Sequence, residues 1–398
     1  MIDFKNTQIA FEAKSNADLR RAKFLFNSIK HTWVVKLGKI FVYITGKIKF
    51  PVGWLLKPTI YKQFVGGETL QKCTPLAQQL MKYGIRSIFD YSAEGGGSAD
   101  DIQQTFEEFI SSIKYAKGNE NVAYTVFKPT ALTVDELLEK ASAKAELNED
   151  EQKNYGEYKQ RFETLCQLAY DNNVRILVDA EDYCFQDAID DFTEEMMRKF
   201  NKKRAIVFTT LQMYRHDRLQ YLEKLYNDAV ENNYTVGMKF VRGAYMEKER
   251  ERAKQLGYKD PICPTKQATD ENYNRGLSYV IEHIDKFEVF SGTHNEESNQ
   301  FLANLIEKHH LTRNDNRIFF AQLYGMSDNL SYNLAHEGYN VTKYIPYAPV
   351  KKVLPYLIRR AEENTAIAGQ TTRELELIKA EIKRRKTEKK LQKNNKRQ

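Results

Sequence analysis

The sequence has few of the residues that build disulfide frameworks, metal sites or membrane spans. Its four cysteines are scattered through 398 residues without C-x-x-C spacing, which indicates reduced, buried thiols in a cytoplasmic-type compartment. The seven histidines lack metal-ligand spacing, so we expect no metal site. No uninterrupted apolar run approaches the roughly 18 to 20 residues that cross a bilayer. The acidic residues near the start argue against a transit peptide, and no signal peptide is indicated.

Charge is divided unevenly along the chain, whose total is +7. Residues 19–67 contain ten Lys and Arg and no acidic residue, and residues 381–398 contain nine basic and two acidic residues, so the middle of the chain is acidic. A chain that is basic only near its ends is not typical of nucleic-acid binding, and we expect no nucleic-acid partner. The stretch Trp33–Trp54 mixes large apolar residues with lysines. That mixture suits either a surface lying on a membrane or a helix packed on the main domain.

Short runs rich in β-branched and aromatic residues recur along the chain, with helical patterns between them. We predict eight strands, at Ser87–Tyr91, Val122–Pro129, Arg175–Glu181, Ala205–Tyr214, Val236–Tyr245, Phe287–His294, Arg317–Gly325 and Val341–Tyr347. Helical patterns include Asp101–Lys117, Leu219–Asn232, Glu297–His309 and Asp328–His336. Eight alternating units predict a (β/α)8 barrel. A doubly wound sheet would fit the alternation too, but no G-x-G-x-x-G follows the first strand.

The predicted strands end in polar residues, which in a barrel would gather at one mouth. These residues are Lys128, Asp179, Glu181, Gln212, Tyr214, Lys239, Arg242, Tyr245, Thr293, His294, Asn295, Gln322, Lys343 and Tyr344. Cations outnumber carboxylates among them, which favours an anionic ligand such as a phosphate-bearing cofactor or a carboxylate substrate. The charged segment Ser142–Gln160 is predicted to be a solvated helical insertion, and the tail beyond Arg373 a basic helix that frays into disorder.

The segment Pro349–Asn364 carries two stripes at helical spacing. One is apolar, and the other contains Tyr356, Arg359, Arg360 and Glu363. The polar stripe suits the solvated face of an outer helix. It equally suits a carboxylate clamp with an aromatic wall, if the helix lies across the barrel mouth.

Several long motifs in one order resemble the proline dehydrogenases, of the monofunctional mitochondrial type and of bifunctional bacterial proline-utilisation enzymes. They are RILVDAED (Arg175–Asp182), TLQMYRHD (Thr210–Asp217), KFVRGAYMEKER (Lys239–Arg250), GTHN (Gly292–Asn295), AQLYGMSD (Ala321–Asp328) and KYIPYAPVKKVLPYLIRRAEEN (Lys343–Asn364). The resemblance covers about residues 70–375. It implies a distorted TIM-like barrel with the last helix over the mouth, a helical basic N-terminal arm (1–75), a barrel domain (76–370) and a basic C-terminal helix (371–398).

The resemblance also implies site residues. The expected catalytic residues are Lys128, Arg359 and Arg360, which would hold the proline carboxylate. The pyrrolidine ring would be enclosed by Tyr245, Leu323, Tyr344 and Tyr356. FAD would be held by Asp179, Gln212, Lys239, Val241, Arg242, Gly243, Thr293, His294, Asn295 and Glu363. Lys239 would lie near the flavin N5 and Arg242 near the pyrophosphate. Asp179 would orient either Lys128 or the flavin-side network, and Glu363 would pair with the clamp arginines or with the adenosine ribose.

The activity that the resemblance implies is oxidation of L-proline to 1-pyrroline-5-carboxylate, with hydride transfer to FAD and reoxidation by ubiquinone or menaquinone. We expect a bacterial cytoplasmic enzyme held peripherally at an anionic inner membrane through its basic arm. The alternative within the same fold is hydroxyproline dehydrogenase, although the phenol of Tyr344 would crowd a ring hydroxyl. A basic membrane- or RNA-binding scaffold on an inactive barrel is the alternative from another class.

Overall fold

Eight parallel strands close into one barrel in a computed structural model that describes residues 2–29, 56–93, 98–366 and 370–396, without the side chains of 362–371. The strands follow sequence order, and β1 pairs with β8 to complete the ring. They are β1 (Ile85–Tyr91), β2 (Val122–Phe127), β3 (Ile176–Val178), β4 (Val207–Gln212), β5 (Val236–Val241), β6 (Phe287–Gly292), β7 (Ile318–Leu323) and β8 (Val341–Tyr347). The closed ring confirms the predicted barrel and excludes the doubly wound sheet.

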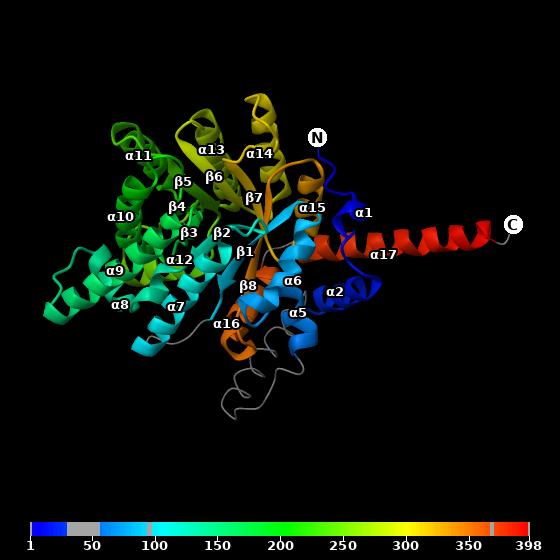
Figure 1. Ribbon diagram of the computed structural model, residues 1–398, viewed down its shortest axis with the longest axis horizontal. Helices are drawn as coiled ribbons and strands as arrows, with labels where there is room; N and C mark the ends of the chain where they lie inside the picture. Colours follow the sequence, from blue (N-terminus) through cyan, green and yellow to red (C-terminus); the bar gives the residue numbers. More distant parts are fainter. Residues whose placement is uncertain (1, 30–55, 94–97, 367–369, 397–398) are drawn as a thin grey trace.

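Helices surround the barrel and extend from its ends (Figure 1). Before β1 come α1 (Thr7–Ala10), α2 (Asn16–Ile29), the π-helix η1 (Lys57–Tyr61), α5 (Lys62–Phe64) and α6 (Leu70–Met81). Between strands lie α7 (Ala99–Ala116), the 3-10 helix η2 (Pro129–Leu132), α8 (Asp135–Ser142), α9 (Glu149–Asp171), α10 (Tyr183–Phe200), α11 (Arg218–Glu231), α12 (Met246–Leu256), α13 (Lys266–Glu282), α14 (Glu296–Lys308) and α15 (Asp328–His336). After β8 follow α16 (Val350–Ala366) and α17 (Gln370–Asn395).

The barrel interior is filled by large side chains rather than by a channel. The ring of Tyr124 packs edge-on against Phe208, Phe290 and Phe319, each with ring centroids 5.2 Å apart. Alternate residues of one strand face opposite ways, so Phe208 joins this inner cluster while its neighbour Val207 joins the outer core under the helices. The packed interior leaves only the strand ends available for a ligand.

The predicted strands are found, but several end earlier than predicted. β3 stops at Val178 and β5 at Val241, whereas the apolar pattern extended them to Glu181 and Tyr245. Beyond these points the residues leave the ladder and form the loops that carry polar side chains. The four predicted helices correspond to α7, α11, α14 and α15, within two residues at each end.

The segment predicted as one solvated insertion, Ser142–Gln160, is two different structures. Ser142 ends α8, and α9 starts at Glu149 with an Asn148 capping box. Tyr158 and Phe162 of α9 are fully buried, and Phe162 packs edge-on against Phe127 of β2. The high charge hid an amphipathic helix of the outer barrel layer, because its apolar residues are concentrated in its second half.

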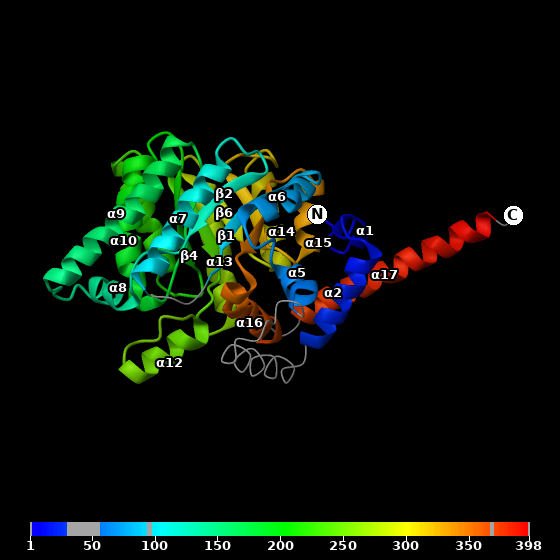
Figure 2. The same cartoon turned by 60° about the horizontal axis from the view of Figure 1, so that its bottom comes forward.

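The two ends of the chain pack on each other beside the barrel. Helix α17 lies against α1 and α2 and then projects away from the body (Figures 1 and 2). Leu375 and Ile378 are buried there, and the helix continues to Asn395, so the prediction that it frays into disorder is wrong over this range. The whole stretch Trp33–Trp54 lies outside the described residues. The domain boundaries at 75 and 370 remain predictions.

Candidate active site

Helix α16 lies across the C-terminal end of the barrel, on the same side as α12 (Figure 2). The pKa values of two residues at the strand ends show which side chains of α16 lie near them. Burial and Arg360 are the first causes that lower the pKa of His294, after β6, to about 3. Glu181 and burial raise the pKa of Tyr245 well above its usual value, and Arg359 opposes that rise. Tyr356 is buried and Arg359 and Arg360 are half-buried, so these three residues of the polar stripe do not form a solvated outer face.

Asp179 joins three strands at the mouth. Its Oδ1 lies 2.5 Å from Nζ of Lys239 on β5, and its Oδ2 accepts a hydrogen bond of 2.9 Å from the hydroxyl of Tyr344 on β8. The Lys239 ammonium also lies 5.0 Å from the centroid of the Tyr344 ring. The carboxylate therefore fixes a cation and a phenol side by side over the barrel core.

Glu181 is a second carboxyl, two residues further along the same loop, and it is buried. It accepts hydrogen bonds from the hydroxyls of Thr130, at 3.0 Å, and Tyr245, at 3.2 Å. Burial raises its pKa to about 7, Lys128 opposes the rise, and Asp179 adds to it. Lys128 thus lies within electrostatic reach of Glu181, on the side of the mouth that Tyr245 and Arg359 share.

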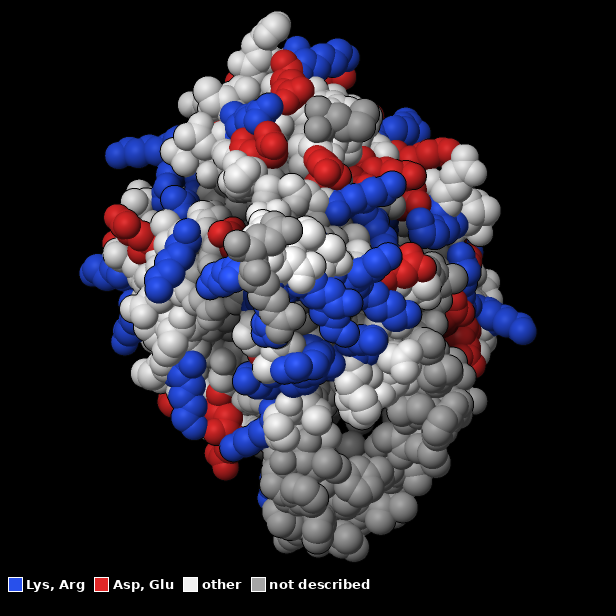
Figure 3. All heavy atoms as spheres, turned by 90° about the vertical axis from the view of Figure 1, so that its right-hand side faces the viewer, with Lys and Arg blue, Asp and Glu red and all other residues white. Residues whose placement is uncertain are grey.

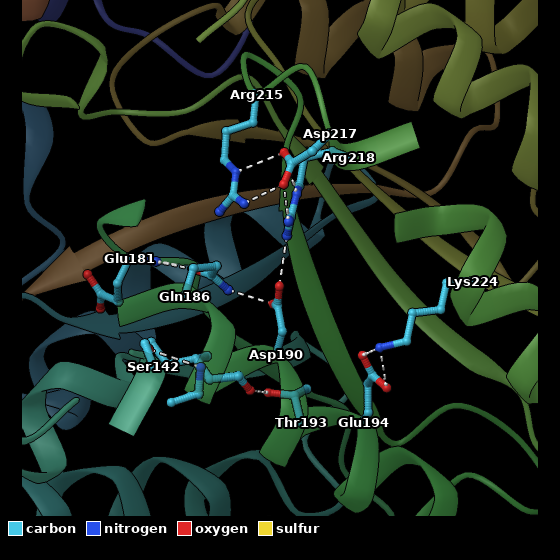
Figure 4. Close-up of polar contacts among 12 residues, drawn as sticks. Ser142, Glu181, Gln186, Asp190, Thr193, Glu194, Arg215, Asp217, Arg218 and Lys224 are labelled. Atoms are coloured by element: carbon cyan, nitrogen blue, oxygen red, sulfur yellow. Dashed lines mark hydrogen bonds and ion pairs between the residues drawn. The ribbon is translucent and has the colours of Figure 1, made fainter. Parts of the chain in front are cut away.

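A chain of buried polar contacts supports the loop that carries Glu181 (Figure 4). The backbone N–H of Glu181 donates to Oε1 of Gln186 at 2.8 Å, and the Gln186 amide donates to Asp190 at 2.7 Å. Arg218 then bonds Asp190 at 2.7 Å. Asp217 receives two bonds each from Arg218 and Arg215. The motif TLQMYRHD therefore supplies both strand-end residues and the ionic support behind them.

Arg242 organises the mouth on the β5–β6 side. Its guanidinium donates to Asp270 at 2.7 Å, to the hydroxyl of Thr293 at 2.6 Å and to that of Ser298 at 3.0 Å. It lies 4.5 Å from the centroid of the Tyr273 ring. Three acceptors and an aromatic face hold the cation in one orientation.

Helix α14 begins at this cation. Asn295 caps it by accepting from the backbone N–H of Ser298 at 2.9 Å, and the Asn295 N–H donates to Thr293 at 3.1 Å. A helix N-terminus beside an arginine attracts anions. His294, next to the cap, contacts Ser327 with Nδ1 and Oγ 2.9 Å apart.

Gly243 is required by close packing as well as by its backbone. Its φ is +129°, and a Cβ placed there would lie 2.5 Å from the Tyr214 ring. The carbonyl of Val241, two residues earlier, accepts from the N–H of Met213 at 2.8 Å. Gln212, which ends β4, is buried. The loop after β5 is therefore pressed against the end of β4.

The structure brings most of the predicted site residues to one mouth, in two groups. The first group contains Lys128, Asp179, Lys239, Tyr245, Tyr344, Tyr356 and Arg359, which are linked by contacts and charges around Asp179 and Glu181. The second contains Arg242, Thr293, His294 and Asn295, at the start of α14. Arg360 is linked to both groups, because it lies 5.5 Å from the centroid of the Tyr356 ring and also lowers the pKa of His294. Leu323 ends β7 and pairs in register with Tyr344. The side chain of Glu363 lies outside the described residues. Asp179 bonds Lys239, and its role toward Lys128 or the flavin side stays a prediction.

Sequence reasoning missed several members of the site. Glu181 was noticed as a strand end but given no role, although its burial makes it one of the site's most perturbed acids. Asp270 and Ser298, which orient Arg242, lie on helices α13 and α14 and belong to none of the recognised motifs. Ser298 lies in the first turn of α14, which begins at Glu296. A polar residue at the start of a predicted helix is the one sequence signal that could have pointed to it.

The residues present fit a flavin dinucleotide. The donors beside α14 suit a pyrophosphate, since they combine a guanidinium, a hydroxyl and a helix N-terminus. Lys239 offers a buried ammonium donor for a flavin ring at the barrel mouth.

Comparison with known proteins gives one family. The model described as Proline dehydrogenase matches residues 73–373. The carbapenem antibiotics biosynthesis protein CarD of Pectobacterium carotovorum is 34% identical over 322 residues, which cover 81% of this chain and 83% of that protein. Human mitochondrial proline dehydrogenase 1 is 43% identical over 229 residues, covering 57% of this chain and 38% of that protein.

A solved structure shares the fold. Proline utilization A from Bdellovibrio bacteriovorus, inactivated by N-propargylglycine, superposes with a TM-score of 0.70 at 20% identity, covering 90% of this chain and 38% of that one. The chain thus spans most of the carbapenem protein but less than half of the human and Bdellovibrio proteins. The family match covers more than half of the chain, and its motifs build the barrel mouth described above. The chain belongs to the proline dehydrogenase family.

Proposed function

We propose that the protein is an FAD-dependent proline dehydrogenase that oxidises L-proline to 1-pyrroline-5-carboxylate. The observation that carries the proposal is helix α16, which lies across the C-terminal end of the barrel (Figure 2) and carries Arg359 and Arg360 near Tyr245 and His294. Two guanidinium groups there suit the carboxylate of a small amino acid. Lys128, near Glu181, would add a third cation on the β2 side.

A bound FAD would supply the two-electron acceptor, at its N5, for the hydride of the proline C5–H bond, while the nitrogen lone pair forms the C=N bond of the imine. The chain's own residues supply geometry. Arg359, Arg360 and Lys128 would fix the carboxylate, and Tyr245, Leu323, Tyr344 and Tyr356 would enclose the ring, so that C5 is presented in one orientation. Lys239, held by Asp179, would donate to the flavin. Arg242, Thr293, His294 and Asn295 would hold its phosphates, and Gln212, Val241 and Gly243 would line the ring side. The proton from the amine would pass to solvent.

A visible spectrum of the purified protein tests this proposal. We expect flavin absorption bands that bleach when L-proline is added without oxygen, and formation of a product that reacts as a cyclic imine. 4-Hydroxyproline and D-proline are the matched comparisons. Faster bleaching by hydroxyproline would favour the alternative substrate, and a colourless protein that binds no FAD would exclude the proposal. The relative named for carbapenem biosynthesis makes the product assay necessary, because membership of the family alone does not fix the pathway served.

We further propose that quinone, ubiquinone or menaquinone, reoxidises the flavin at an anionic membrane, to which the enzyme binds peripherally from the cytoplasmic side. Within the described residues, no helix combines the length and apolarity needed to cross a bilayer. What supports surface binding is charge: basic side chains gather on the face from which α17 projects (Figure 3). Helices α2 and α17 pack together, and their exposed basic residues include Arg20, Lys23, Lys386, Lys389 and Lys390. Phe24, beside Lys23, is 70% exposed.

A further inference from the structure

Both ends of the chain converge on the loop between β7 and α15, although they lie outside the span matched by the family model. The backbone carbonyl of Phe4 accepts from the Asn329 side chain at 3.1 Å. Lys14 pairs with Asp328 at 3.4 Å, and Glu374, in the second turn of α17, accepts from the backbone N–H of Ser327. Figure 1 shows α1 and α17 beside α15.

Ser327 connects the contacts of the chain ends to the candidate active site, because it bonds both Glu374 and His294. Its backbone is left-handed, with φ 50° and ψ 42°, a conformation that is costly for residues other than glycine, asparagine and aspartate. The N–H bond to Glu374 helps to hold it there, and its Oγ lies 2.9 Å from Nδ1 of His294. A strained residue held from one side and bonded to a site histidine on the other indicates a positioning role.

The surrounding charges depend on both termini. Lys343 of β8 is fully buried, and its Nζ lies 2.9 Å from Asp328 and 2.6 Å from the carbonyl of Met326. Asp328 is shared between Lys343 and Lys14. Burial raises the pKa of Glu374 to about 7, with Asp328 adding to the rise and Lys343 opposing it. Since an uncompensated buried charge is strongly destabilising, this cluster requires the terminal segments to be docked.

We propose that Ser327 is a positioning residue for His294, and that Glu374 of the C-terminal helix fixes Ser327, so that the terminal helix completes the cofactor site. The inference rests on the proposed role of His294 toward FAD. Ser327 occupies Nδ1 of the imidazole and so directs Nε2 toward the other side, where a ligand would lie. Without that bond the His294 ring would not be fixed in one orientation before the cofactor binds, and binding would have to order it.

The test measures how fast the holoenzyme releases FAD, by the fluorescence of freed flavin after dilution. Ser327→Gly removes the hydroxyl while glycine accepts the left-handed backbone without strain, so stability should hold. We expect release and the dissociation constant to rise about 3- to 10-fold, as for one lost hydrogen bond. In a His294→Ala background, Ser327→Gly should have no further effect, because the partner is already absent.

Glu374 provides the second arm of the test. Glu374→Ala should increase FAD release in the same direction as Ser327→Gly, whereas Glu374→Gln, which keeps an acceptor for the Ser327 N–H, should release FAD at nearly the wild-type rate. Glu376→Ala, at an exposed position of the same helix, is the matched control. Wild-type FAD release in Ser327→Gly, or additive effects with His294→Ala, would overturn the inference. A wild-type protein that binds no FAD would instead overturn the proposed function.

Discussion

The ammonium of Lys239 and the carboxylate of Asp179 form an ion pair of 2.5 Å that joins β5 to the loop after β3. Both groups are largely shielded from water, and such a pair is stable only where the two charges are brought into close contact, as they are here. The second carboxylate oxygen binds Tyr344, which places the proposed substrate wall and the proposed flavin contact on one anchor.

This shared anchor lets the two roles of Tyr344 be separated. Tyr344→Phe removes only the bond to Asp179, whereas Tyr344→Ser also removes the ring that would crowd a substrate hydroxyl. We expect Tyr344→Ser to lower kcat/KM for proline and to raise the ratio of hydroxyproline to proline turnover, with little change of that ratio in Tyr344→Phe. Steady-state kinetics on both substrates measure this. Equal losses on the two substrates in Tyr344→Ser would show that the ring is not the gate.

The two arginines of α16 should govern proline affinity. Replacing Arg359 or Arg360 with Met removes a charge-assisted bond to the carboxylate, worth about 1.5–3 kcal/mol, so KM for proline should rise roughly 10- to 100-fold. Flavin content should persist in at least Arg359→Met. Lys351→Met, at an exposed position of the same helix, is the control and should leave KM unchanged. An unchanged KM in both arginine variants would contradict the clamp.

Glu181 should make stability depend on pH. Its pKa is about 7 in the folded protein against a usual 4.5, so the folded state binds the proton more tightly than the unfolded chain. Its contribution is complete below pH 4.5 and is lost as the pH rises toward 7 and above. We expect the free energy of unfolding in urea to fall between pH 5 and 8 more steeply in wild type than in Glu181→Gln, by on the order of 3 kcal/mol. Parallel curves for the two proteins would show that burial does not perturb this acid.

The ionic chain behind Glu181 should contribute more to stability than a surface pair of the same kind. Arg218 and Asp190 are both almost fully buried, so Arg218→Met would leave Asp190 without its cation and cost about 3–5 kcal/mol. Lys224 bonds Glu194 nearby but is 57% exposed, and Glu194 keeps Arg198. Lys224→Met should therefore cost under about 1 kcal/mol. Urea unfolding of the two variants decides the matter, and equal losses would contradict the distinction drawn from burial.

Membrane binding should depend on the basic residues near the two termini. We expect wild type to co-sediment with anionic vesicles, to release at high salt and to bind neutral vesicles poorly, because each basic residue near an anionic surface contributes about 1 kcal/mol. Replacing Lys36, Lys39, Lys47 and Lys49 with Gln should weaken binding and leave turnover with a soluble dye unchanged.

The tail requires its own variant in that experiment. The first turns of α17 are packed on the body, so deleting the helix would disturb the fold. Replacing the exposed Lys386, Lys389, Lys390 and Lys393 with Gln changes charge alone. Vesicle binding that is indifferent to both sets, or absent in wild type, would contradict peripheral attachment.

The sequence by itself determined the repeating architecture, because strand and helix periodicity are local properties. Alternating β-branched runs and amphipathic helices predicted eight units, and the motifs located the polar strand ends. It erred where local pattern is ambiguous. The charge of residues 142–160 concealed the buried face of α9, and the apolar pattern extended β3 and β5 past the point where their backbones leave the ladder.

Only the tertiary structure decided which of these residues meet. The stripe of α16 suited either a solvated face or a clamp, and periodicity alone could not choose, because both place the same residues on one side of a helix. Asp179, Lys239 and Tyr344 come from three strands, and Lys14, Ser327 and Glu374 lie more than 300 residues apart at their extremes. Such partners are chosen by barrel closure and by the docking of the chain ends. These are long-range events, in which burying a charge is tolerated only where its counterpart is brought to it.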